Sequence, residues 1–180
     1  MKRLLVCAGV LAVAATVFAQ HKPAASPSEI VTATVGSANV TIKYSSPRVK
    51  GREGHIFTKD GLIGHDHTYP VWRAGANAAT TLETSAEIQI GDLDVPAGTY
   101  TLFVNIADPD HWDLIVSKAT GEWGLSYDAS KDLGKTKMHM SKPASMVEDL
   151  KYTITGEGSG KGKLTLAWEN KEASVSIKSK

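Results

Sequence analysis

An alternation of apolar and polar residues recurs along this chain and constrains its fold more than any other feature. It is clearest in Asn39–Tyr44, where Val40, Ile42 and Tyr44 fall on one side of an extended backbone. Because successive side chains of a strand point to opposite faces, a period of two predicts strands with one buried face. Similar segments predict further strands at 30–35, 80–84, 87–90, 99–106, 112–117, 137–140, 150–155, 163–168 and 173–177.

Turn-forming residues separate these segments. Examples are Gly91-Asp92, Pro96-Ala97-Gly98 and the glycine-rich stretch 156–162, which we expect to be a hairpin tip. No segment has a convincing helical period, although 128–133 could form one turn. The chain is therefore predicted to be all-β: an antiparallel β-sandwich, jelly-roll or immunoglobulin-like, or a partly closed barrel.

The first 19 residues have the pattern of a signal peptide. Lys2 and Arg3 give it a positive start, and the apolar run Leu4–Phe18 follows. This run is shorter than the ~20 apolar residues of a membrane-spanning helix. An uncleaved membrane anchor is the remaining alternative. We predict export to the periplasm or the extracellular space.

The predicted organisation is a signal peptide at 1–19, a flexible leader at 20–28 and a single β-sandwich domain at 29–180. The only cysteine, Cys7, leaves with the signal, so the mature chain would have no disulfide. It would hold 18 basic and 19 acidic residues, a net charge of −1, which does not fit a nucleic-acid-binding protein. No later stretch is long and apolar enough to cross a bilayer.

A connection without a strand pattern, 45–81, contains the candidate ligand site. Guanidinium groups match carboxylate, phosphate or sulfate in a bidentate manner. An indole offers an apolar face to a ligand, and a carboxamide can orient its hydroxyl groups. The residues that we select for these roles are Arg48, Arg52, Trp72, Arg73 and Asn77.

A purely structural interpretation of the same residues stays open. Arg52 would then be a solvated loop charge, and Arg73 would pair with an acid such as Glu83 or Glu87. Trp72 would belong to the core, where tryptophan is usually found. This alternative makes the protein a structural component of the cell envelope.

The pair His65 and His67 suggests a metal site, because alternate residues of an extended segment point to the same side. Asp66 would point away, so His55, Glu53 or a distant acid would have to complete the site. Without a recognisable third ligand the signal is weak, and we assign no required cofactor. A metal-dependent or acid/base hydrolase using these histidines is the alternative function. No catalytic frame such as Gly-x-Ser-x-Gly is present, so we name no catalytic residue.

Several blocks of residues occur in a defined order: Ser46-Pro47-Arg48 with Gly51-Arg52, 71–77, Val95-Pro96-Ala97-Gly98-Thr99-Tyr100, Trp123-Gly124 with Tyr127-Asp128, and Trp168-Glu169-Asn170. Together they resemble the bacterial family catalogued as domain of unknown function 2911. The resemblance covers nearly the whole mature chain and implies an exported, strand-rich single domain. It supplies no catalytic assignment. The link that contains His65 and His67 departs from the family's short glycine-containing link, so the family lends no metal role to this pair.

These observations favour an exported β-sandwich that binds a small polar or anionic molecule, or a partner surface, through the 48–77 region. We expect a binding protein rather than an enzyme.

Overall fold

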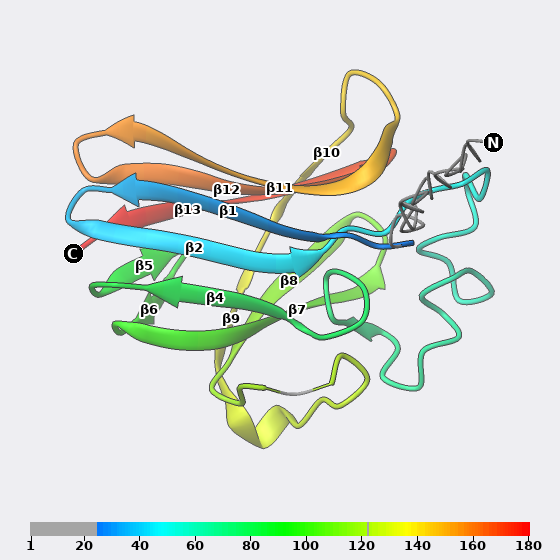
Figure 1. Cartoon of the computed structure of the whole chain (residues 1–180), viewed down its shortest axis with the longest axis horizontal. Coiled ribbons are helices and arrows are strands. Elements are labelled where there is room, and N and C mark those ends of the chain that lie inside the picture. The colour runs from blue at the N-terminus through cyan, green and yellow to red at the C-terminus, as the bar shows by residue number, and fades with distance from the viewer. Residues whose placement is uncertain (1–24, 122) are drawn as a thin grey trace, which may run out of the picture.

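Two antiparallel sheets face each other in the computed structural model, which describes residues 25–121 and 123–180. They form a sandwich that is not closed into a barrel (Figure 1), so the all-β prediction is confirmed. The predicted signal peptide lies outside the described residues. Of the predicted leader, residues 25–28 are described, and the first strand already begins at Ser28.

The first sheet has the strand order β1-β2-β4-β7-β8-β9, with the short β3 paired to β7. In β2 the predicted alternation is present, since the even-numbered residues from Ala38 to Tyr44 are buried, whereas β7 and β8 hold continuous buried runs. The strands are β1 (Ser28–Val35), β2 (Ala38–Ser45), β3 (Val71–Trp72), β4 (Thr80–Thr84), β7 (Gly98–Asp108), β8 (His111–Ser117) and β9 (Asp132–Lys137).

The second sheet has the order β11-β12-β13-β5-β6, with β10 paired to β13. The glycine-rich stretch forms the turn between β11 and β12, as predicted. The strands are β5 (Ile88–Ile90), β6 (Leu93–Val95), β10 (His139–Ser141), β11 (Val147–Gly158), β12 (Lys161–Glu169) and β13 (Lys171–Ser179).

Two details of the strand prediction are wrong. The single strand expected at 137–140 is divided between β9, which ends at Lys137, and β10, which begins at His139. The short strands β3 and β6 were not predicted, and neither was β9 apart from Lys137, because the sequence of β9 has no apolar alternation. The single turn expected within 128–133 is present as the 3-10 helix η1 (Ala129–Lys131), which is shorter than that range because Asp132 already starts β9.

Aromatic residues fill one end of the space between the sheets. Trp72 and Trp112 come from the first sheet and Trp168 from the second, and each is only 2% exposed. Phe57 packs against all three, with ring centroids 5.0–5.7 Å apart. These close edge-to-face and tilted contacts join the two sheets through a single core.

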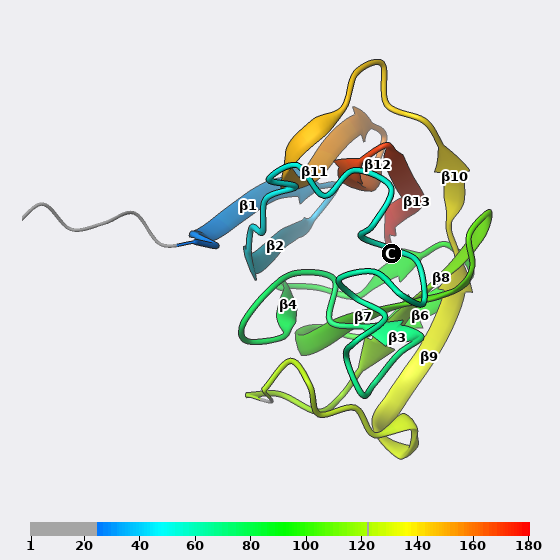
Figure 2. The ribbon, with the colours of Figure 1, turned by 90° about the vertical axis from the view of Figure 1, so that its right-hand side faces the viewer.

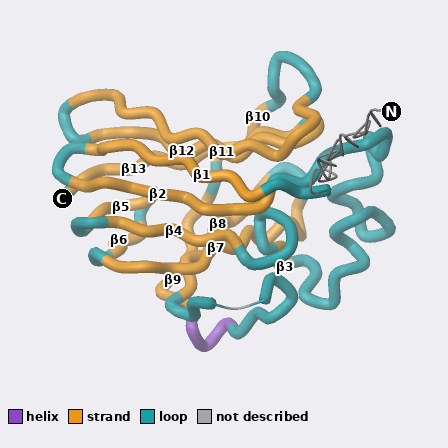
Figure 3. Tube along the Cα trace, in the orientation of Figure 1, coloured by secondary structure: helices purple, strands orange, loops and turns teal. Residues whose placement is uncertain are grey.

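The connection that brings Phe57 here, residues 46–70, crosses from the first sheet to the second at this end (Figures 2 and 3). After β2, its start pairs with β11: the Val49 amide donates to the Glu148 carbonyl over 2.9 Å, and the Leu150 amide donates to the Pro47 carbonyl over 2.9 Å. The Ser46 hydroxyl donates to the Leu150 carbonyl over 2.7 Å. The connection is therefore docked on the sandwich. Within the described ranges, no helix has the length and apolar character needed to cross a membrane.

Candidate functional site

A cavity of about 350 Å³ opens where the 46–70 connection meets the loop after β3. It is lined by residues that lie far apart in the sequence, from Ala25 to Trp168. All five residues selected as ligand contacts line it: Arg48, Arg52, Trp72, Arg73 and Asn77. We call this space the arginine cavity, because the chain has four arginines and the three beyond Arg3 all line it.

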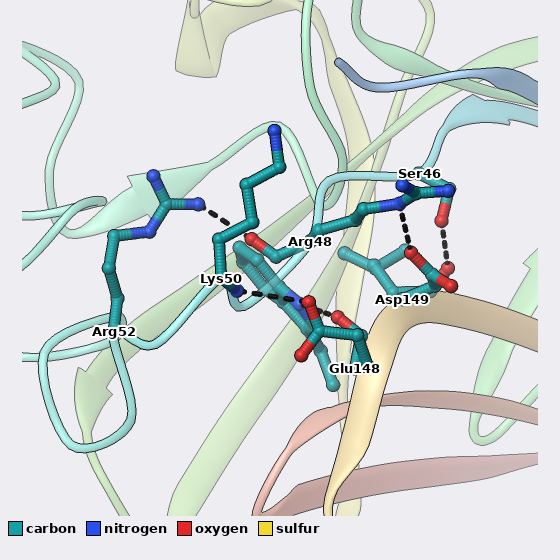
Figure 4. Close-up of polar contacts among 8 residues, drawn as sticks. Ser46, Arg48, Lys50, Arg52, Glu148 and Asp149 are labelled. Atoms are coloured by element: carbon teal, nitrogen blue, oxygen red, sulfur yellow. Dashed lines mark hydrogen bonds and ion pairs between the residues drawn. The ribbon is translucent and has the colours of Figure 1, made fainter. Parts of the chain in front are cut away.

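Only the Nε of the Arg48 guanidinium has a partner within the part of the protein that the structure describes. Its Nε donates to Asp149 Oδ1 over 2.7 Å (Figure 4), and the two side chains are 44% and 54% exposed. No hydrogen bond from the two terminal nitrogens of Arg48 is found among the described residues. An exposed ion pair of this kind contributes only about 0–1 kcal/mol to stability. Arg48 can therefore keep its fork available to a ligand.

Arg52 and Lys50 form no ion pair with an acid in the described part of the chain. Arg52 Nη2 donates to the Arg48 carbonyl over 2.6 Å, which holds the guanidinium above the loop, and its Nε is buried without a hydrogen-bond partner. The Lys50 backbone amide donates to Glu148 Oε1 over 3.0 Å. In Figure 4 the Lys50 side chain lies between those of Arg48 and Arg52. Three cations thus gather on alternate residues of one loop.

Arg73 is tied to its own surroundings instead. Its Nη2 donates to Asp66 Oδ2 over 2.9 Å, with side chains only 14% and 19% exposed, and its Nη1 donates to the Asn77 carbonyl over 3.1 Å. The partners considered from the sequence are used elsewhere, because Glu83 pairs with Lys43 and Glu87 with Lys180. Arg73 therefore shapes the wall of the cavity.

The loop 73–77 has an unusual backbone that this arrangement stabilises. Ala74 and Asn77 both have positive φ, 53° and 59°, a region that residues other than glycine rarely adopt. The Ala74 carbonyl accepts hydrogen bonds of 3.0 Å from the Thr80 hydroxyl and from the Tyr152 hydroxyl. The Asn77 side chain is exposed and makes no hydrogen bond to the described residues. Its side-chain amide is therefore open to a ligand.

Trp72 forms the buried floor of the cavity. It stacks on Trp168 with centroids 5.9 Å apart, and its Nε1 donates to the Gly75 carbonyl over 3.3 Å. The open aromatic face belongs to Trp123, which is 59% exposed and lines the same cavity. Trp123 was not selected from the sequence, because only the fold brings it to this loop through a bridge to Ala78.

The two histidines do not converge. His65 Nδ1 lies 2.6 Å from the Gly61 carbonyl, whereas His67 Nε2 lies 2.8 Å from the Leu125 carbonyl. Their segment consists of turns, so the expected extended geometry is absent. No group of three or more histidine, cysteine or acidic side chains is placed to hold a metal within residues 25–121 and 123–180. The structure thus gives the metal prediction no third ligand there.

A second, larger cavity of about 810 Å³ lies under the connection between β8 and β9. Phe103 and Tyr127 line it with centroids 5.0 Å apart. Tyr127 donates to Asp132 Oδ2 over 2.7 Å. Burial raises the pKa of both side chains, and the acceptor carboxylate raises the pKa of Tyr127 further. This pair anchors the connection, and the lining holds no arginine.

The geometry defines an all-β sandwich with a positively charged cavity at one end. The profile of the family described as "Protein of unknown function (DUF2911)" matches residues 26–177, so the chain belongs to that family. Searches of curated proteins and of solved structures give no match.

Proposed function

We propose that this protein binds a small anionic molecule in the arginine cavity. Arg48, Lys50 and Arg52 would hold the anion, while Arg73 and Asp66 fix the wall. The single observation that carries the proposal is the concentration of every arginine beyond Arg3 around one cavity. Lysine outnumbers arginine fourfold in this chain, so the use of arginine here points to the bidentate recognition that lysine cannot provide.

The charge balance of the lining supports an anion. Four cationic residues, Arg48, Lys50, Arg52 and Arg73, face a single acid, Asp66, so the lining has a net charge of +3. Asp149 lies outside the lining and offsets Arg48 in part. The remaining charge belongs to Lys50 and Arg52, whose side chains form no ion pair with a described acid, although the Glu148 carboxylate accepts from the Lys50 backbone amide. A ligand carboxylate, phosphate or sulfate would complete this set.

The buried nitrogen of Arg52 supports the same conclusion. Buried polar atoms in proteins nearly always have a hydrogen-bond partner, and an exception calls for a missing acceptor. Together with Arg73 Nε, which also belongs to a lining residue of the cavity, Arg52 Nε is one of four such atoms in the described chain. A bound anion or an ordered water would satisfy it.

The proposal is tested by calorimetric titration of the purified protein with phosphate, sulfate and acetate at low ionic strength. We expect Arg52→Ala to weaken binding about tenfold or more, because a hydrogen bond to a charged group contributes about 1.5–3 kcal/mol. Lys163→Ala is the charge-matched control, since Lys163 is exposed toward the opposite end of β12 from Trp168. The proposal would be refuted if none of the three anions bound, or if Arg52→Ala and Lys163→Ala lost the same amount of anion affinity.

We also propose that the protein acts outside the cytoplasm. The support is the pattern of its first 19 residues. Mass determination of the protein isolated from its native cells should show loss of about those residues.

A further inference from the structure

We infer that the ligand of the arginine cavity is an acidic monosaccharide, a single sugar ring that carries a carboxylate. This inference rests on the anion site proposed above and adds the chemistry of the group attached to the anion. Three features of the cavity carry it: an exposed indole, an unused carboxamide and a small volume.

The exposed indole is the first feature. Tryptophan is highly buried on average in folded proteins, and the other three tryptophans of this chain are each 2% exposed. Trp123 is 59% exposed, yet its backbone is fixed by the bridge to Ala78 and by the hydrogen bond from the Ser126 amide to its carbonyl over 2.8 Å. An aromatic face that borders a cavity suits the apolar face of a flat or ring-shaped ligand.

The unused carboxamide is the second feature, and it favours a sugar over an aromatic acid. Asn77 lines the same cavity as Trp123, and Arg73 holds its carbonyl. A carboxamide offers two donors and one acceptor, which is the set that neighbouring hydroxyl groups of a sugar require. An aromatic acid would fill the apolar surface but leave these groups without partners.

The cavity volume is the third feature. About 350 Å³ lies near the lower end of the range of roughly 300–1,000 Å³ for small-molecule sites. This space suits one sugar ring better than an extended oligosaccharide. The cations of the 48–52 loop on the same lining would bind its carboxylate.

The test is a titration of the purified protein with glucuronate and galacturonate, followed by calorimetry and tryptophan fluorescence. Glucose and galactose lack the charge, acetate lacks the ring, and 4-hydroxybenzoate replaces the sugar by an aromatic ring. We expect one of the uronates to bind about tenfold more tightly than acetate and both neutral sugars to bind weakly at best, with a change in tryptophan emission.

Two variants separate the parts of the site. Trp123→Ala should reduce uronate affinity about tenfold and leave acetate binding unchanged, whereas Arg52→Ala should weaken both. Uronates that bind no better than acetate, or tighter binding of 4-hydroxybenzoate, would overturn the sugar inference and leave the anion site intact. No binding of any anion would overturn the proposed function as well.

Discussion

At the scale of single residues, the site divides into groups that are used by the fold and groups that remain available. Arg73 donates from both terminal nitrogens, to Asp66 and to the Asn77 carbonyl, although its Nε is buried without a hydrogen-bond partner in the described chain. Arg48 has one acidic partner, Asp149, and Arg52 has none among the described residues. Burial determines how much stability is lost when one of these ion pairs is broken. A partly buried charge that loses its partner is left with an unfavourable desolvation, while an exposed charge is hydrated by water.

The first stability prediction follows from this difference. Asp66→Asn should lower the free energy of unfolding by about 1–3 kcal/mol, because Arg73 keeps its charge but loses its carboxylate. The matched control is Glu83→Gln in the exposed pair with Lys43, for which about 0–1 kcal/mol is expected. Urea unfolding of both variants measures the difference. If Asp66→Asn lost no more stability than Glu83→Gln, the ion pair between Asp66 and Arg73 would not stabilise the fold as described.

At the scale of elements, the connection between β8 and β9 supplies Trp123 and is anchored by Tyr127. Tyr127 packs on Phe103 of β7 and donates to Asp132 at the start of β9. The other carboxylate oxygen of Asp132, Oδ1, is buried and has no hydrogen-bond partner. The tyrosine hydroxyl therefore makes the principal contact that stabilises the charged form of this carboxylate.

This anchor predicts a pH-dependent variant. Burial raises the pKa of Asp132 above its ordinary value, so the folded state binds the carboxyl proton more tightly than the unfolded chain does. The contribution of Asp132 to the free energy of unfolding therefore falls as the pH rises from its pKa in the unfolded chain to its pKa in the folded protein. The hydrogen bond from Tyr127 opposes that rise. Tyr127→Phe should thus raise the pKa further and cost about 1–3 kcal/mol at pH 7, with a smaller cost at acid pH. Urea unfolding of both proteins at several pH values provides the measurement, and a cost independent of pH would contradict this explanation.

At the scale of the whole molecule, the sequence predicted the framework better than the site. Alternation in segments such as 38–45 is a local signal, and the structure places its apolar residues in the core. Arg48, Arg52, Arg73 and Asn77 were selected because they share one connection, and that connection folds back on itself. Trp123 could not be selected, because its place at the cavity depends on the path of the distant 118–131 connection. The burial of Trp72 depends likewise on Trp168 from the other sheet.

The central claim is that the 46–70 connection folds across both sheets to present the guanidinium groups of Arg48 and Arg52, which retain free N–H donors, to an anion. Arginine Nε–H signals in an NMR titration with phosphate test it most directly, because only three arginines lie beyond Arg3. We predict saturable shifts of the Arg48 and Arg52 signals, each assigned by substitution with lysine, and a smaller shift of Arg73. Signals of Arg48 and Arg52 that stay unchanged at high phosphate concentration, in a protein that remains folded, would contradict the account.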